Sequence, residues 1–122
     1  MEDRALTELA RTYLEYYRTG DDALFWAYEK VNDECHKLDG GLPICLALID
    51  ASNTDEELAY VAAGPIEDLI RRVGPEAVLA LDSPAAQSRK VRFALAGVWL
   101  NEEDPGYAEW HSLVLRYPVE LM

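Results

Sequence analysis

Residues 59–75 read AYVAAGPIEDLIRRVGP, with one Gly-Pro step at Gly64-Pro65 and another at Gly74-Pro75. Proline has no N–H to donate inside a helix, and it pushes the residue before it out of the helical region. Proline nevertheless fits the first position of a new helix, and glycine is a common residue just past a helix end. The sequence therefore predicts two helices that meet at a corner at Gly64-Pro65, and a third helix that begins at Pro75.

The helices on either side of this corner carry signals of their own. Thr54 is followed three residues later by Glu57, which is the spacing of a capping box, so the first helix should begin near Asp55. In the second helix apolar residues recur at spacings of three and four, with acids at its N-terminal end and bases at its C-terminal end, as the helix dipole favours. The apolar residues are Ile66, Leu69, Ile70 and Val73, the acids Glu67 and Asp68, and the bases Arg71 and Arg72.

The rest of the chain also has the pattern of short helices. Helical spacing or start signals occur in residues 3–18, after a cap at Asp21 or Asp22, in residues 42–51 and 77–81, and from Pro84 and Pro105 onward. Residues 42–51 are apolar on every side, which is typical of a buried central helix. No stretch alternates with period two for long enough to predict a strand. We predict an all-α fold, in which residues 1–122 form a single domain of seven or eight short antiparallel helices in paired layers, similar to a helical repeat.

The chain is strongly acidic, with 23 acids, 11 bases and a formal net charge of −12. Residues 1–61 hold 14 acids and 5 bases, and residues 62–122 hold 9 and 6, so the first half carries a net charge of −9 and the second of −3. Such a field repels nucleic acid and anionic membranes and attracts basic proteins. We therefore predict no nucleic-acid and no membrane partner. Two explanations of the acidity stay open: it attracts a basic protein partner, or it serves solubility alone. The one basic cluster, which we expect to pair with acids of the same chain, is Arg89, Lys90 and Arg92.

The predicted cellular compartment also predicts the redox state of the two cysteines. Residues 1–3 are acidic and no apolar run reaches the length of a membrane span, which favours a cytoplasmic protein. In that compartment thiols are usually reduced. Cys35 and Cys45 are therefore expected to be free and packed as small apolar groups.

Trp26 lies on the polar side of the second predicted helix. The apolar line expected to face the core consists of Leu24, Tyr28, Val31, Cys35 and Leu38. At about 100° per residue, Trp26 falls on the other side of the helix. Its neighbours there are Glu29, Asp33 and Lys37. Either another part of the chain covers Trp26, such as a loop at residues 39–41, or Trp26 anchors an interface with Glu29 and Asp33 as its charged rim.

Three short motifs resemble those of a known family. The first is Trp-x-x-Glu, the second Tyr-x-x-Ala-Gly-Pro-Leu/Ile-Glu-Asp-Leu-Leu/Ile, and the third Leu-x-Gly-Val-Trp. They are matched by Trp26 and Glu29, by Tyr60 with residues 63–70, and by Leu95 with residues 97–99. From about Trp26 to Leu100 the chain resembles an uncharacterised bacterial family of small helical proteins, a domain of unknown function. The resemblance implies an all-α fold and a bacterial source, and it assigns no activity.

The sequence contains no recognisable catalytic, metal or cofactor site. Glu67 and Asp68 are adjacent, so on a helix their carboxylates point about 100° apart and do not form a facing pair. We expect Glu67 to have a structural role, accepting hydrogen bonds from Tyr60 or from backbone N–H groups at the helix start. The cysteines and histidines match no zinc spacing, and we find no catalytic triad, phosphate loop or dinucleotide fingerprint. The sequence therefore predicts no catalytic residue, no metal and no cofactor, and it does not favour an enzyme.

Two functional hypotheses follow. The first is a protein-interaction module, an immunity- or antitoxin-like binder of a basic partner that uses Trp26, Glu29 and Asp33. The alternative is a small enzyme or ligand-binding protein with a pocket at the Gly64-Pro65 corner. That pocket would be lined by Tyr60, Glu67, Asp68 and Trp99. A self-associating structural domain is the third reading, since the sequence does not fix the oligomeric state.

Overall fold

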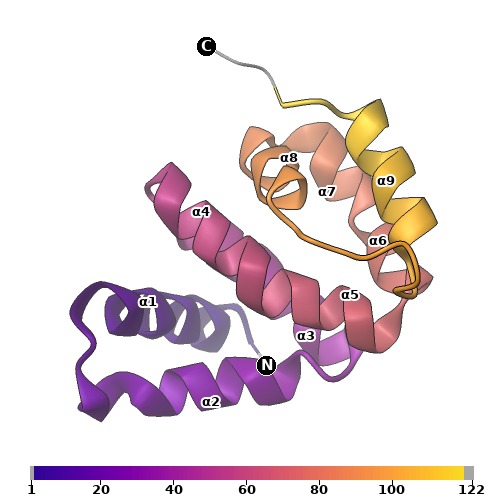
Figure 1. Ribbon diagram of the computed structural model, residues 1–122. Coiled ribbons are helices and arrows are strands. Elements are labelled where there is room, and N and C mark those ends of the chain that lie inside the picture. Colours follow the sequence, from indigo (N-terminus) through magenta and orange to yellow (C-terminus); the bar gives the residue numbers. More distant parts are fainter. Residues whose placement is uncertain (1, 120–122) are drawn as a thin grey trace.

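The computed structural model describes residues 2–119, which form helices joined by short loops, with no strand among these residues (Figure 1). The all-α prediction is therefore confirmed. In chain order the elements are α1 (Asp3–Thr19), a 3₁₀ turn (Asp22–Leu24), α2 (Phe25–Glu34), α3 (Leu38–Ala51), α4 (Asp55–Val61), a π-helix (Ala62–Ile66), α5 (Glu67–Val73), α6 (Pro75–Ala80), α7 (Asp82–Gln87), α8 (Arg89–Ala96) and α9 (Tyr107–Arg116).

The helix α3 lies at the centre of the molecule. It packs against α1, α2, α4, α5, α6 and α8, while α1 and α2 form a hairpin at one end and α6 to α9 gather at the other (Figure 1). Ile44, Cys45, Leu48 and Ile49 of α3 are all buried. The apolar segment predicted as the central helix is thus in the core.

This central helix begins four residues earlier than predicted, at Leu38, so residues 39–41 are its first turn and not a loop. The glycines there serve close packing. A Cβ atom at Gly41 would lie 2.5 Å from Leu69 Cδ1 and 3.1 Å from the Cα atom of Cys35. Glycine allows α3 to approach the end of α2 and the side of α5 at this point.

The corner predicted at Gly64-Pro65 does not exist. α4 continues through the π-helix Ala62–Ile66 into α5 as one helix, with Pro65 inside it (Figure 1). The N–H of Glu67 donates to the carbonyl of Ala62, five residues back. This wider turn accommodates the ring of Pro65, which in a regular α-helix clashes with the carbonyl four residues before it. Glu67 therefore lies in the middle of a continuous helix and not at a helix start.

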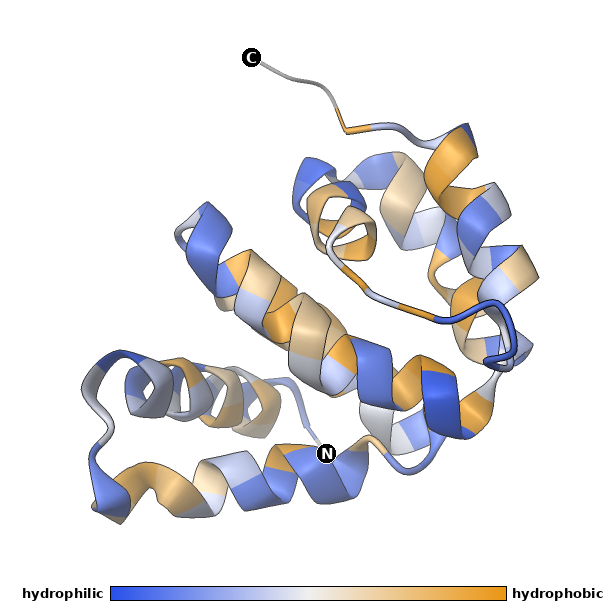
Figure 2. Ribbon diagram, viewed as in Figure 1, coloured by the Kyte–Doolittle hydropathy of each residue, from blue (hydrophilic) through white to orange (hydrophobic). Residues whose placement is uncertain are grey.

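The second Gly-Pro step does break the chain. Gly74 ends α5 with φ 87°, a conformation that favours glycine, and Pro75 begins α6. The prediction at this step is confirmed. Along the continuous helix of α4 and α5, hydrophobic bands alternate with hydrophilic ones, as expected of a helix that is buried on one side (Figure 2).

The capping box at the start of α4 is confirmed. The Thr54 hydroxyl accepts a hydrogen bond from the N–H of Glu57 (3.1 Å), and the Glu57 carboxylate accepts one from the N–H of Asn53 (2.7 Å). The same carboxylate, which is 5% exposed, also accepts from the guanidinium of Arg18 on α1. Glu57 thus joins the cap of α4 to the end of α1.

We expect Glu57→Gln to lower the free energy of unfolding by about 1–2 kcal/mol near neutral pH, because a buried charge-assisted hydrogen bond is lost. The cost is moderate because the partner, Arg18, is half exposed and water can solvate its charge. The bond from Arg18 lowers the pKa of Glu57 below its usual 4.5. Its stabilising effect is therefore complete above that value and is lost as the pH falls through the lower pKa of the folded state. Urea unfolding of the wild type and the variant at neutral and acidic pH measures this difference in stability.

The exposed neighbour Glu56 provides the control, because Glu56→Gln changes the same charge without a buried partner. A loss of stability in Glu57→Gln that is equal at neutral pH and well below pH 4.5 would contradict the assignment.

The basic cluster does not pair with acids as predicted. The ammonium group of Lys90 donates to the backbone carbonyls of Asp50 (2.9 Å) and Ser52 (2.8 Å), at the C-terminal end of α3. Arg92 donates to the carbonyl of Ala85, and Arg89 lies over the ring of Phe93. The last carbonyls of a helix have no partner within it and carry partial negative charge, so they bind cations as carboxylates do.

The two thiols are free and buried, with Cys35 Sγ and Cys45 Sγ 3.9 Å apart. Within residues 2–119 no helix is long and apolar enough to cross a membrane.

Candidate functional site

Exposed aromatic side chains gather on the hairpin of α1 and α2. The described part of the chain has seven large hydrophobic or aromatic side chains that are exposed, and four of them lie within residues 17–28. These four are Tyr17, Phe25, Trp26 and Tyr28. Exposed aromatic residues close together are typical of protein-binding surfaces.

One flank of α2 belongs to a cluster of stacked rings. Tyr28 stacks on Phe25 with ring centroids 5.5 Å apart and on Tyr13 at 6.0 Å, and Tyr17 of α1 stacks on Tyr60 of α4 at 4.1 Å. Tyr13 is buried, and this burial raises its pKa well above the usual value of 10.0. The cluster therefore holds α1, α2 and α4 together as neutral rings, with its outer edge exposed.

Trp26 lies on the other flank of α2 and remains 54% exposed. It borders an open groove of about 290 Å³, whose other walls are Ala5, Glu8 and Leu9 of α1 and Lys30. The loop suggested as its cover, residues 39–41, is part of α3, so that explanation is wrong. Lys37 does not share this face either, because α2 ends at Glu34.

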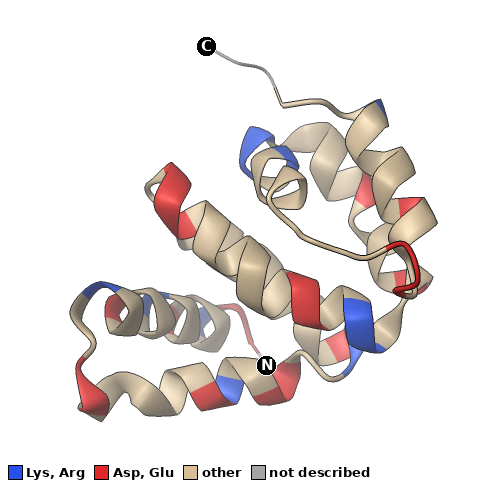
Figure 3. Cartoon of the chain, in the orientation of Figure 1, with Lys and Arg blue, Asp and Glu red and all other residues tan. Residues whose placement is uncertain are grey.

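The two predicted rim residues share the exposed outer face of α2 with Trp26. Glu29 and Asp33 are three and seven residues after Trp26, and both are exposed. Neither forms an ion pair with any of residues 2–119. Further exposed acids lie at the turn between α1 and α2, at Asp21 and Asp22, so acidic residues flank the aromatic surface (Figure 3). Trp26, Glu29 and Asp33 together form the α2 face.

The expected core line of this helix is only partly correct. Val31 and Cys35 are buried as predicted, but Tyr28 is 40% exposed and Ala27 is buried instead. Leu24 belongs to the preceding 3₁₀ turn and Leu38 to α3. The buried side of α2 is centred on residues 27, 31 and 35, which leaves Tyr28 at the edge of the core.

The four residues predicted for a corner pocket have different surroundings. Glu67 is buried, and its carboxylate accepts hydrogen bonds from Arg71 (2.6 Å) and from the backbone N–H of Trp99 (3.2 Å). The ring of Trp99 is 74% exposed, and Tyr60 belongs to the stacked cluster. Glu67 thus attaches α5 to the loop that follows α8. Its partners are Arg71 and a backbone N–H, not Tyr60 and not the N–H groups of a helix start.

Asp68 faces another side of α5 and borders a small pocket. The pocket has a volume of about 30 Å³, and its wall includes Tyr13, Gly64 and Pro65 but neither Glu67 nor Trp99. This volume corresponds to about one water molecule. This pocket beside Gly64 and Pro65 is therefore too small for an organic ligand.

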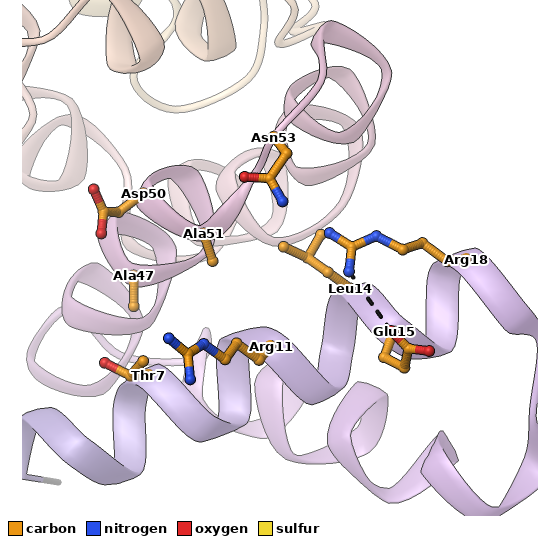
Figure 4. A pocket seen from close by; sticks show the side chains of 9 residues that line it. All are labelled: Thr7, Arg11, Leu14, Glu15, Arg18, Ala47, Asp50, Ala51 and Asn53. Atoms are coloured by element: carbon orange, nitrogen blue, oxygen red, sulfur yellow. Dashed lines mark ion pairs between the residues drawn. The ribbon is translucent and has the colours of Figure 1, made fainter.

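A larger pocket, of about 520 Å³, lies between α1 and α3 (Figure 4). It is lined by Thr7, Arg11, Leu14, Glu15, Arg18, Ala47, Asp50, Ala51 and Asn53. None of these residues was predicted as a site residue, because the pocket walls come from two helices that are distant in the sequence. The spacing of seven between Arg11 and Arg18, which places both on one side of α1, is the one signal that could have indicated it.

The described residues offer no metal site, since no three of their His, Cys, Asp and Glu side chains come together in a suitable group.

Fold and surfaces together define a small all-α protein with an exposed aromatic and acidic face on its first helical hairpin. A model of a family of unknown function, DUF6869, matches residues 15–110, and since this is most of the chain, the protein belongs to that family. The resemblance to an uncharacterised helical family is confirmed. No curated protein and no solved structure matches the chain.

Proposed function

We propose that this protein is a protein-binding module that captures a basic partner on the α2 face, in the manner of an immunity protein or antitoxin of the bacterial cytoplasm. The observation that carries the proposal is the exposure of Trp26 beside Glu29 and Asp33, whose carboxylates have no ion-pair partner within residues 2–119. Tryptophan is among the residues most enriched where binding energy is concentrated. Phe25, exposed on the adjacent flank of α2, enlarges the apolar area.

Charge indicates which partner would fit. The first 61 residues carry a net −9, and this half includes the α2 face. A basic surface would therefore be drawn to it, and the association rate would fall as salt screens the attraction. Glu29 and Asp33 would face the cations of the partner, while Trp26 would fill an apolar hollow in it.

The test compares capture from a lysate of the source cells by the wild type, Trp26→Ala, Asp33→Lys and Trp99→Ala. Trp99 is the matched control, because it is even more exposed but lies in the loop that follows α8 and not on α2. A candidate partner is then purified, and its dissociation constant and association rate are measured over a range of salt concentrations. Circular dichroism checks that each variant is folded.

We expect one basic protein that is held by the wild type and by Trp99→Ala. Trp26→Ala should weaken binding by at least about tenfold, as loss of a hot-spot residue does. Asp33→Lys should lower the association rate and its salt dependence. A partner that binds Trp26→Ala as tightly as the wild type, or one that is acidic, would refute the proposal.

A further inference from the structure

The pocket between α1 and α3 shares no residue with the α2 face. Its volume of about 520 Å³ is within the range of small-molecule sites. Its floor is apolar, made by Leu14 of α1 with Ala47 and Ala51 of α3. Polar and charged groups surround this floor on both sides (Figure 4). Six of the nine lining residues are polar or charged, so the pocket suits a polar ligand with a small apolar part.

The charges of the pocket do not all neutralise one another. The guanidinium of Arg18 is bound by Glu57 and by Glu15 (3.6 Å), so this cation already has two carboxylate partners within the chain. Arg11 is different. Of the eight arginines, all of which lie within residues 2–119, it alone has no ion pair, hydrogen bond or ring contact in the structure, although the chain holds 23 acids.

One carboxylate of the pocket is also unpaired. Asp50 on α3 binds Lys90 through its backbone carbonyl, whereas its side chain has no partner among residues 2–119. Asn53, three residues after Asp50, also lines the pocket (Figure 4). Internal pairing thus leaves one cation on the α1 wall and one anion on the α3 wall.

We propose that this pocket binds a small zwitterion of the amino-acid type. The ligand carboxylate would pair with the guanidinium of Arg11, whose planar donors suit a carboxylate. The ligand ammonium would pair with the carboxylate of Asp50, and its apolar side chain would cover Leu14, Ala47 and Ala51. Inorganic phosphate is a poor fit, because Glu15 and Asp50 and the overall charge of −12 repel a dianion.

The probes are L-leucine and the dipeptide leucyl-leucine, two zwitterions of different length. N-acetyl-L-leucine lacks the ammonium charge, L-leucinamide lacks the carboxylate, and inorganic phosphate is a simple anion. Binding at millimolar concentrations is followed by amide chemical shifts in ¹⁵N-labelled protein, which also report the location. At least one zwitterion should shift the amides of α1 and α3 around the pocket, and removal of either ligand charge should weaken its binding about fivefold, the effect of losing one partly exposed ion pair.

Variants assign each charge to its residue. Arg11→Gln should weaken the zwitterion about fivefold and leave L-leucinamide unchanged, and Asp50→Asn should weaken it by a similar factor and leave N-acetyl-L-leucine unchanged. Arg4→Gln is the control, since Arg4 is on the same helix outside the pocket and pairs with Glu8. All three positions are exposed, so the fold is expected to survive, and thermal unfolding verifies this.

Absence of any shift around the pocket with both zwitterions would overturn the proposal, and so would binding that Arg11→Gln does not weaken. Phosphate bound as tightly as the zwitterion would identify a simple anion site instead. None of these outcomes bears on capture of a protein by the α2 face, whose variants leave the pocket intact.

Discussion

Leu48→Ala is expected to lower the free energy of unfolding by about 3–4 kcal/mol, within the range measured for leucine truncation in tightly packed cores. Leu48 is fully buried on α3, the helix that contacts six others. Its truncation therefore leaves a cavity between elements that are already in contact, and the surrounding helices cannot close it without separating from their other neighbours. Because a domain of this size has a total stability of about 5–15 kcal/mol, the loss is a large part of the whole.

Urea unfolding followed by circular dichroism measures the effect, and Leu79→Ala is the matched control. Leu79 is 63% exposed, so the same chemical change should cost less than about 0.5 kcal/mol there. If the two variants had the same stability, α3 could not be the centre of the core.

Gly41→Ala is expected to lower the free energy of unfolding by about 2–3 kcal/mol, the cost of overpacking a tight contact. The added methyl group would lie 2.5 Å from Leu69 Cδ1, and Leu69 is fully buried, so a shift of its side chain would disturb its neighbours in the core. It would also approach two backbone atoms, the Cα of Cys35 at 3.1 Å and the carbonyl oxygen of Glu34 at 3.2 Å. The entropy gained by replacing glycine in a helix, up to about 1 kcal/mol, does not compensate for this.

Gly64→Ala makes the same substitution in the π-helix and should be neutral or stabilising by up to about 1 kcal/mol. A Cβ atom there would meet the Tyr13 hydroxyl at 3.5 Å, an ordinary contact. Thermal unfolding of both variants gives the comparison. Equal stability of Gly41→Ala and the wild type would contradict the close approach of α3 to α5, and strong destabilisation by Gly64→Ala would contradict the continuous helix.

The two proposed sites differ in how they could be found from the sequence. The α2 face lies on a single helix, so a spacing of three and four residues was enough to place Trp26, Glu29 and Asp33 together. The pocket between α1 and α3 combines Arg11 with Asp50, which are 39 residues apart, and no local pattern relates them. The corner pocket failed for a similar reason, since Tyr60, Glu67 and Trp99 were grouped on the assumption of a bend that is absent.

Features that depend on neighbours within about one helical turn could be predicted from the sequence. The helical class, the cap at Thr54, the stop at Gly74 and the polar side of α2 are of this kind, because capping, the left-handed conformation and helical spacing involve only nearby residues. Tertiary structure alone decided whether a Gly-Pro step bends the chain.

At Gly64-Pro65, Val61, Ala62 and Ile66 are fully buried, and the π-helix packs against α3 and α8, so burial of one continuous apolar face outweighs the cost of a proline inside a helix. At Gly74-Pro75 the chain instead turns into α6. The same dipeptide thus gives opposite results, because the free energy that decides between them comes from contacts with residues distant in the sequence.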